Sequence, residues 1–222
     1  MSRSRPIICA SIVDGDLKAI KIAEPLVDLL EVRIDLIGDG WPELVKHLEK
    51  PWIACNRTAG EGGSWQGSES ERIRELLKAI ELGADIVDIE LGTGDLKKTV
   101  KLVKKDAKCL LSFHNLKETP PLARMRGIVK RQLEAGADIC KVATTARKFE
   151  DNLSVLQLIA DFPKTRVVSF AMGPLGSASR IICPLVGGDF TYASTRQGKE
   201  SAPGQITVRD LRTIYGMLGD GK

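Results

Sequence analysis

The 222-residue chain contains no stretch that approaches the roughly 18 consecutive apolar residues of a membrane-spanning helix, and its first residues lack the apolar core of a signal peptide. We therefore expect a cytoplasmic protein that does not bind membranes. A strong excess of charge of one sign is also absent, since 33 basic and 29 acidic residues leave a formal net charge of +4. This balance argues against a dedicated nucleic-acid-binding protein and is compatible with a small anionic substrate.

Paired cysteines are missing as well. The cysteines are odd in number, show no CxxC spacing and stand in or beside apolar stretches: Cys9, Cys55, Cys109, Cys140 and Cys183. This pattern argues against a disulfide framework or a zinc site and fits a reduced intracellular compartment. Asp85, Asp88 and Glu90 share one predicted strand, but no second cluster with metal-ligand spacing accompanies them. We interpret them as charged residues of a barrel interior and expect no metal.

Short apolar runs alternate with helical patterns along the whole chain. The runs predict strands at residues 6–11, 30–34, 51–56, 85–91, 109–114, 138–143, 165–171 and 189–193. Helices are predicted at residues 14–29, 41–48, 70–82, 95–105, 121–135, 149–161, near 181 and at 207–218. Strict alternation predicts a parallel sheet, and this number of units in one chain of this length predicts an α/β protein with a single (β/α)8 TIM barrel as its only domain, over residues 1–222.

Lys141 interrupts one of these apolar runs. A lysine is almost never fully buried unless it is paired or used, although a lysine at a strand end can also extend its ammonium to solvent. Other strands repeat the placement, because His114 ends the preceding run and residues 30–35 alternate apolar residues with charges. The active site of a TIM barrel lies at the C-terminal ends of its strands, where Arg33 and Arg57 also fall. The repetition predicts a functional site there.

These residue types are suited to Schiff-base chemistry. A lysine that is desolvated and close to other cations loses its proton more easily, and the neutral amine can attack a ketone or aldehyde. The resulting iminium acidifies the neighbouring carbon, and His114 is placed to act as the general base. Arg33, Arg57 and Arg180 suit a carboxylate or a hydroxyl-rich substrate, because guanidinium pairs bidentately with carboxylates.

Sequence motifs in a fixed order extend nearly from end to end of the chain. They are Glu31-Val32-Arg33-Ile34-Asp35, Arg57 followed by Glu61-Gly62-Gly63, Ser112-Phe113-His114-Asn115, Lys141-Val142-Ala143, Met172-Gly173 with Ser179-Arg180, and Ser201-Ala202-Pro203-Gly204-Gln205. Each is weak alone, but together they are specific. The chain thereby resembles the type I 3-dehydroquinate dehydratases, the Schiff-base-forming barrel enzymes of the shikimate pathway.

The resemblance implies the conversion of 3-dehydroquinate to 3-dehydroshikimate by syn elimination of water, without a cofactor. It implies that Lys141 forms the imine, that His114 moves the proton and that Glu61 orients His114. Arg180 would clamp the substrate carboxylate. The implied substrate-binding set is Ser11, Glu31, Arg33, Arg57, Met172, Arg180, Tyr192, Ser201 and Gln205. The family is often dimeric, so we also expect a homodimer.

Two features depart from the family pattern. Tyr192 stands where the family often has phenylalanine, and residues 192–200 form a longer and more polar stretch than expected. Residues 195–205 lack the apolar periodicity of a core segment, so we expect a mobile loop that orders over the substrate and brings Ser201 and Gln205 into the site.

Other interpretations of the same residues stay open. A Schiff-base aldolase or transaldolase on the same fold would use Lys141 with a phosphorylated substrate, but Arg180 and the Glu61–His114 pairing favour the dehydratase. A non-catalytic barrel that only binds ligands is the third hypothesis. Residue by residue, His114 could be a structural histidine, and Met172 could fill the core.

Overall fold

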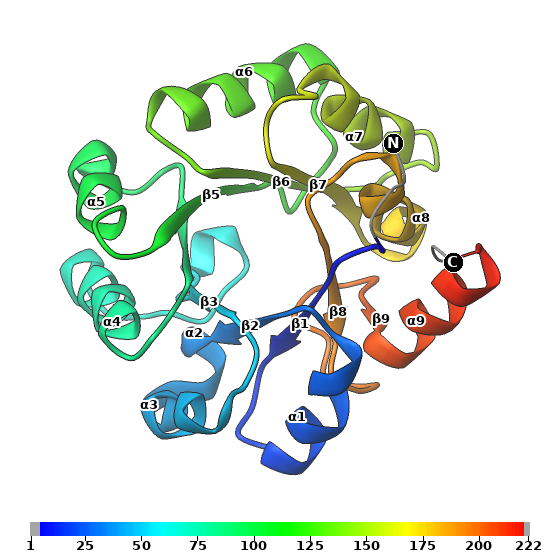
Figure 1. Cartoon of the computed structure of the whole chain (residues 1–222). Coiled ribbons are helices and arrows are strands. Elements are labelled where there is room, and N and C mark those ends of the chain that lie inside the picture. The colour runs from blue at the N-terminus through cyan, green and yellow to red at the C-terminus, as the bar shows by residue number, and fades with distance from the viewer. Residues whose placement is uncertain (1–4, 220–222) are drawn as a thin grey trace.

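The computed structural model describes residues 5–219, which form a ring of parallel strands surrounded by helices (Figure 1). The strands are β1 (Ile8–Ile12), β2 (Leu29–Arg33), β3 (Trp52–Cys55), β4 (Ile86–Glu90), β5 (Lys108–His114), β6 (Ile139–Thr145), β7 (Val167–Met172), β8 (Thr191–Ser194) and β9 (Ile206–Thr207). The α-helices are α1 (Leu17–Ala23), α2 (Ile34–Ile37), α3 (Trp41–Leu44), α4 (Glu69–Glu81), α5 (Leu96–Val103), α6 (Leu122–Glu134), α7 (Asp151–Asp161), α8 (Ser177–Ile182) and α9 (Val208–Met217).

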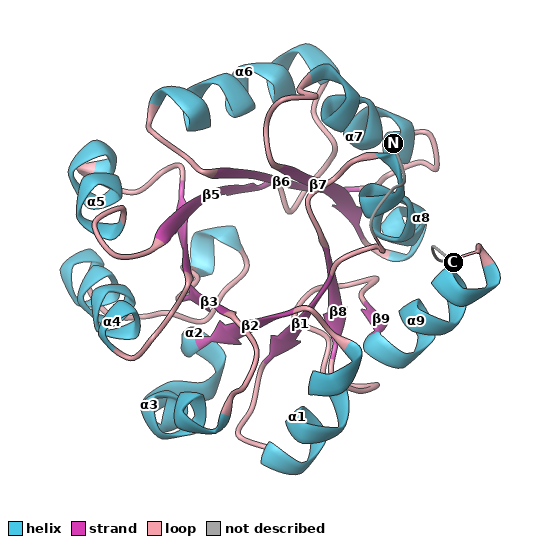
Figure 2. Cartoon of the chain, viewed as in Figure 1, coloured by secondary structure: helices cyan, strands magenta, loops and turns pink. Residues whose placement is uncertain are grey.

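The strands form one curled sheet in the order β7-β6-β5-β4-β3-β2-β1-β8-β9. Figure 2 shows the strands forming the wall of this ring and the helices on its outside. Asp189 N donates to Val167 O at 2.8 Å and thereby joins the segment before β8 to the start of β7. The predicted α/β TIM barrel is confirmed.

Several element boundaries differ from the sequence prediction. The helix expected over residues 14–29 is only α1, because a 3-10 turn (Glu24–Leu26) that contains Pro25 takes over where proline removes a backbone donor. The segment between β2 and β3 divides into α2 and α3 instead of one helix. β6 continues to Thr145, so Lys141 lies inside the strand and not near its end. β9 is two residues long, too short for a periodic signal.

Two helix–strand junctions share the sequence Gly-Ala-Asp and the same structure. At the second one, Gly136 has φ +97°, a conformation that glycine adopts without strain. Asp85 and Asp138 then accept a hydrogen bond from a backbone amide at the start of the neighbouring strand, Asp85 from Trp52 N at 3.0 Å and Asp138 from Cys109 N at 2.8 Å. Asp85 is exposed and fixes strand register at the N-terminal end of the barrel, so the predicted interior position is wrong for Asp85, whereas Asp88 and Glu90 are buried.

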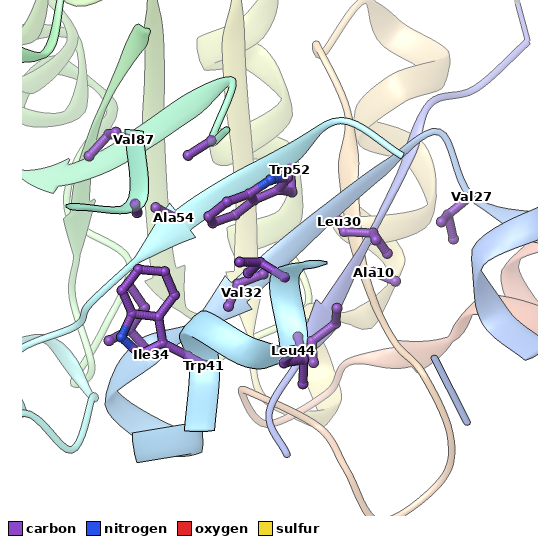
Figure 3. Packing of buried hydrophobic residues seen from close by; sticks show 14 of the residues in the cluster. Ala10, Val27, Leu30, Val32, Ile34, Trp41, Leu44, Trp52, Ala54 and Val87 are labelled. Carbon is purple, nitrogen blue, oxygen red and sulfur yellow. The ribbon is translucent and has the colours of Figure 1, made fainter. Parts of the chain in front are cut away.

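Strand alternation separates two cores. Along β6, Ile139 and Ala143 point into the barrel, whereas Cys140 and Val142 pack against the outer helices. Figure 3 shows the outer core near α3, where Trp41 lies against the sheet. Because Lys141 shares the inward face with Ile139 and Ala143, the strand directs its ammonium into the barrel.

Gln132 joins the two strands that carry His114 and Lys141. It lies on α6 and is fully buried, and its Nε2 donates to Leu111 O on β5 and to Lys141 O on β6, both at 2.9 Å. One side-chain amide therefore connects helix α6 to both strands from outside the barrel.

All five cysteines are buried free thiols, as the sequence predicted. No helix within residues 5–219 is long and apolar enough to cross a membrane.

Candidate active site

A cavity of about 130 Å³ opens at the C-terminal ends of the strands. It contains every sequence-predicted site residue except Ser11. The lining consists of Glu31, Arg33, Cys55, Arg57, Glu61, Gly62, His114, Leu116, Lys141, Ala143, Phe170, Met172, Arg180, Tyr192, Ser201, Ala202, Pro203 and Gln205. The sequence analysis did not identify Leu116 and Phe170 as part of this lining, because these apolar residues carry no chemical signal in the sequence.

Lys141 lies at the floor of the cavity with its side chain 5% exposed. Its Nζ donates to Asp88 Oδ2 at 3.1 Å and lies 3.6 Å from Glu31 Oε1 and 4.2 Å from the centre of the Tyr192 ring. The sequence reasoning expected cations next to this lysine. The nearest charges are instead carboxylates, which attract the ammonium.

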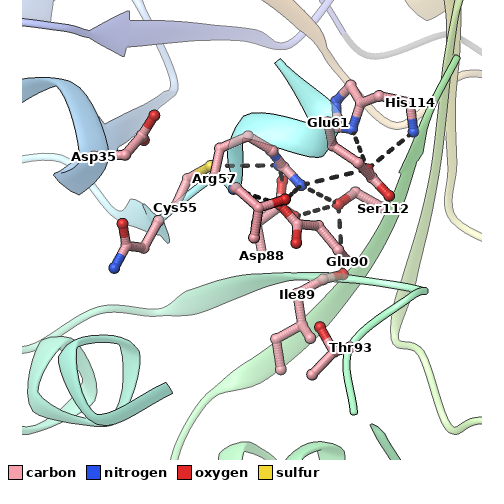
Figure 4. A network of polar contacts seen from close by, with 12 residues as sticks. Asp35, Cys55, Arg57, Glu61, Asp88, Ile89, Glu90, Thr93, Ser112 and His114 are labelled. Atoms are coloured by element: carbon pink, nitrogen blue, oxygen red, sulfur yellow. Dashed lines mark hydrogen bonds and ion pairs between the residues drawn. The ribbon is translucent and has the colours of Figure 1, made fainter. Parts of the chain in front are cut away.

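His114 and Glu61 form a buried pair at the mouth of the cavity (Figure 4). Glu61 ends a 3-10 turn (Ala59–Glu61), and its Oε2 accepts from His114 N at 3.0 Å and contacts His114 Nδ1 at 2.8 Å. Burial raises the pKa of Glu61 to about 7, while burial and the charges of Arg57 and Lys141 lower the pKa of His114 well below its ordinary value. The imidazole is therefore neutral, and with Glu61 ionised its Nε2 keeps a free lone pair.

Arg57 lies in a network of buried polar groups beneath this pair (Figure 4). Its Nη2 donates to Asp88 Oδ2 at 2.6 Å and its Nη1 donates to Ser112 Oγ at 2.6 Å, while Ser112 Oγ donates to Asp88 Oδ1 at 2.6 Å. Glu90 Oε1 accepts from Thr58 N at 2.9 Å, which holds the start of the loop that carries Glu61. Sequence reasoning missed these roles of Asp88, Glu90 and Ser112, although the first two alternate on β4 as inward-facing residues would.

The close packing of the backbone around Gly63 requires a glycine at this position. A Cβ atom at this position would lie 2.1 Å from Arg57 O, so a larger residue would push the loop away from Arg57. Gly63 N also donates to Thr58 O at 2.8 Å. The close approach of these two backbone segments fixes Glu61 above His114.

The other two arginines of the cavity have opposite environments. Arg33 pairs bidentately with Asp35 at 2.9 and 2.7 Å. Arg180 on α8 stacks 4.3 Å above the Phe170 ring, and within residues 5–219 no carboxylate forms an ion pair with it. Burial lowers the pKa of Arg180 to about 10. Arg180 is thus a buried cation whose charge is not neutralised by the protein.

The loop after β8 lies across the mouth of the cavity. Gln205 Oε1 accepts from Ser201 N at 2.7 Å, and Gln205 Nε2 donates to Ser11 Oγ at 3.3 Å. Ser11 Oγ in turn donates to Glu31 Oε2 at 2.8 Å, which places Ser11 behind Glu31 and outside the cavity lining. The mobility of this loop without ligand stays a prediction.

The unexpectedly polar part of this loop has partners on the β1–α1 connection. Arg196 pairs with Asp14 at 3.0 Å and with Asp16 at 2.6 Å, and Lys199 pairs with Asp14 at 3.0 Å. These side chains are partly exposed, so each pair contributes little alone. Together they hold the first half of the loop beside the barrel.

Glu31, Cys55 and Asp88 bring three ligand-type atoms within 4.8 Å of one another. Lys141 Nζ already contacts the two carboxylates, so an ammonium occupies the place that a cation would take. Burial also raises the pKa of the Cys55 thiol, which disfavours the thiolate that metals bind. The cluster is better explained as the surroundings of Lys141 than as a metal site.

Comparisons with known proteins agree along the whole chain. A model of the type I 3-dehydroquinase family matches residues 6–222. A 3-dehydroquinate dehydratase from Dehalococcoides mccartyi is 42% identical over 210 residues, which cover 95% of this chain and 94% of that protein. One from Methanocaldococcus jannaschii is 36% identical over 220 residues, which cover 96% and 99%. The crystal structure of 3-dehydroquinate dehydratase from Geobacillus kaustophilus superimposes with a TM-score of 0.84 at 28% identity, covering 96% of this chain and 91% of that one.

The family match, the identities and the shared barrel give one conclusion. The chain belongs to the type I 3-dehydroquinase family and is an enzyme of the hydro-lyase class.

Proposed function

We propose that this enzyme converts 3-dehydroquinate to 3-dehydroshikimate, the third step of the shikimate pathway to chorismate, through a Schiff base on Lys141. The observation that carries the proposal is that Lys141 and His114 line the same cavity. In the register of β5 and β6, Ser112 pairs with Lys141 and His114 with Ala143, so both functional side chains face the same interior. The relatives named above supply the substrate.

The proposed reaction uses groups of the chain alone. Lys141 gives up a proton, its neutral Nζ attacks the substrate ketone, and the hydroxyl of the carbinolamine takes up a proton and leaves as water to give an iminium. The iminium withdraws electrons from the adjacent carbon, and His114 Nε2 removes its proton to leave an enamine. The enamine then expels the hydroxyl group, which takes the proton back from His114 as water. Hydrolysis of the product iminium releases 3-dehydroshikimate and restores the lysine.

Glu61 is proposed to keep His114 in the productive tautomer, because its carboxylate accepts from Nδ1 and leaves Nε2 toward the cavity. A neutral histidine is the form that can take a proton, in agreement with its lowered pKa. Arg180 is proposed to bind the substrate carboxylate. Its unneutralised charge in a desolvated site supports this role, since a charge-assisted pair is strong where water is excluded.

The remaining contacts of the substrate follow from the cavity lining. Glu31, Arg33 and Arg57 are proposed to bind ring hydroxyls, and Met172 and Tyr192 to pack on the ring. Ser201 and Gln205 are proposed to close over the substrate, with Ser11 supporting Gln205 from behind. A single domain, a cytoplasmic location and a homodimer stay predictions.

Borohydride trapping tests the proposal directly. Reduction in the presence of 3-dehydroquinate should add the mass of the reduced ligand to the peptide that contains Lys141, while Lys141→Ala should abolish both the label and the formation of the conjugated enone. Lys108→Ala, which changes an exposed lysine on β5, is the matched control and should be labelled normally. His114→Ala should retain some adduct but lose about 10²–10⁴ in rate, the usual contribution of a general base. A label that persists in Lys141→Ala would overturn the assignment.

A further inference from the structure

Asp88 is the group on which the polar contacts of the cavity floor converge. It lies at the centre of β4, and its side chain is completely buried. Its Oδ2 accepts from Lys141 Nζ at 3.1 Å and from Arg57 Nη2 at 2.6 Å, and its Oδ1 accepts from Ser112 Oγ at 2.6 Å. Neither the cavity lining nor the family motifs include this residue.

The two cations that contact Asp88 differ in whether they keep their positive charge during the reaction. Lys141 must lose its charge before it can attack a ketone, whereas Arg57 keeps its charge because, in spite of burial, Asp88 and Glu90 hold its pKa well above the ordinary value. When Lys141 becomes neutral, Arg57 still pairs with Asp88, so the carboxylate is never a buried charge without a partner. Burial alone would raise the pKa of Asp88, but Arg57, Lys141 and the Ser112 hydroxyl hold it below its ordinary range. Asp88 is therefore a permanent anion and a poor proton acceptor.

We propose that Asp88 is a further catalytic residue, the fixed counterion that stabilises the positive charge on Lys141 Nζ when the iminium forms. The inference rests on the proposed Schiff-base function. The hydroxyl of the carbinolamine takes up a proton and leaves as water, its C–O bond breaks, the nitrogen lone pair forms the C=N bond, and a positive charge appears on Nζ. The carboxylate that faced the ammonium then faces the iminium without rearrangement, and such prearranged charge is an efficient means of transition-state stabilisation.

Glu31 is the alternative counterion, and the geometry favours Asp88. Glu31 Oε1 lies 3.6 Å from Nζ, beyond hydrogen-bond length, while its Oε2 accepts from Ser11. Asp88 makes the hydrogen bond at 3.1 Å. The titratable and charged groups around this position come from several strands and loops and are Cys9, Glu31, Arg33, Cys55, Arg57, Glu61, Glu90, His114, Arg180 and Tyr192.

The test uses Asp88→Asn, which keeps the size of the side chain and removes its charge. In the ligand-free enzyme, acetylation of Lys141 measured by mass spectrometry across pH reports where its amine becomes neutral. Asp88→Asn should move the onset of this reactivity to lower pH, because it removes the carboxylate that stabilises the ammonium from 3.1 Å. At a pH where Lys141 is fully reactive to acetylation in both proteins, the fraction of enzyme trapped by borohydride with the reaction product should fall about tenfold or more, because only the iminium then carries the positive charge that Asp88 stabilises.

Ser112→Ala is the matched control, since it removes a hydrogen bond from Asp88 but leaves the carboxylate next to Lys141. Its acetylation profile should match that of the unaltered enzyme. The double variant Asp88→Asn/Arg57→Gln removes the carboxylate and its arginine together, so it leaves no guanidinium without Asp88, and it should show a smaller shift in the same direction, because the positive charge of Arg57 is removed as well. Circular dichroism reports whether each variant folds.

The outcomes separate the two proposals. Absence of trapping at Lys141 in the unaltered enzyme would refute the Schiff-base function itself. Normal trapping there, combined with unchanged acetylation and unchanged trapping in Asp88→Asn, would overturn only the role of Asp88, even if turnover falls. Failure of both Asp88 variants to fold would assign Asp88 to barrel stability and would also overturn it.

Discussion

Replacement of Arg180 by methionine should stabilise the ligand-free enzyme and weaken substrate binding. Arg180 is 1% exposed, and in residues 5–219 its charge has no carboxylate partner. Its pKa is lowered to about 10, more than two pH units below the ordinary value for arginine, which corresponds to about 3 kcal/mol of unfavourable free energy for the charged form. Methionine keeps the apolar stem but loses the cation–π contact with Phe170, worth about 1–2 kcal/mol. The net expectation is a gain of about 1–2 kcal/mol in the free energy of unfolding.

Arg33→Met provides the opposite case in the same cavity. Arg33 pairs with Asp35 through both carboxylate oxygens, and the Asp35 side chain is completely buried. Removal of this arginine leaves a buried carboxylate without its cation and should cost about 3–5 kcal/mol. Replacement of Arg180 should therefore raise the free energy of unfolding, whereas replacement of Arg33 should lower it.

Urea denaturation measures the free energy of unfolding of both variants. The comparison requires that the slope of this free energy against urea concentration is the same as in the unaltered enzyme. For Arg180→Met the KM for 3-dehydroquinate should rise about 10²-fold, since a lost charge-assisted pair costs up to about 3 kcal/mol. The thermal shift produced by saturating product should shrink accordingly. The reasoning is refuted if Arg180→Met destabilises the protein as Arg33→Met does, or if its KM stays unchanged.

Three further results are expected. The kcat/KM should rise with pH through about 7 as Glu61 ionises, because burial raises its pKa to about 7, and Glu61→Gln should remove this acid limb; a limb that persists in the variant belongs to another group. Tyr192→Phe should raise the free energy of unfolding by about 1 kcal/mol, since the buried Tyr192 hydroxyl has no hydrogen-bond partner within residues 5–219; a loss of stability in urea would contradict this. Gly204→Ala should raise KM about tenfold more than Gly198→Ala. Both glycines have φ near +77°, but only a Cβ at Gly204 would meet Gly173 O, at 2.3 Å. Equal KM values for the two variants would mean that the loop does not dock at this position.

The sequence predicts most of the barrel and the centre of the site because both follow from local rules. Alternation along a strand is visible without any structure, and it places Lys141 inside an apolar run and His114 at the end of the preceding run. Parallel strands then bring these two residues to the same end of the barrel. The same rule recovers Arg33 and Met172 at the ends of their strands.

The parts that sequence reasoning missed depend on distances between residues remote in the chain. Asp88 and Lys141 are separated by 53 positions, and nothing local distinguishes a counterion from any other charge on a strand. Arg196 lies 182 and 180 positions from its partners Asp14 and Asp16. The sequence therefore showed a long polar loop but not the ion pairs that hold it. The first helix was predicted too long because its apolar periodicity continues past Pro25, where the backbone changes to a 3-10 turn.

Gln132 makes the outer surface of the barrel part of the chemistry inside it. Its amide links the carbonyls of Leu111 and Lys141, so any shift of α6 along its axis displaces the lysine and the histidine strands relative to each other. A deep mutational scan should therefore show sensitivity that does not decline smoothly with distance from the substrate. An engineer who redesigns α6, for solubility or for fusion to another protein, is also adjusting the separation of the two reacting groups.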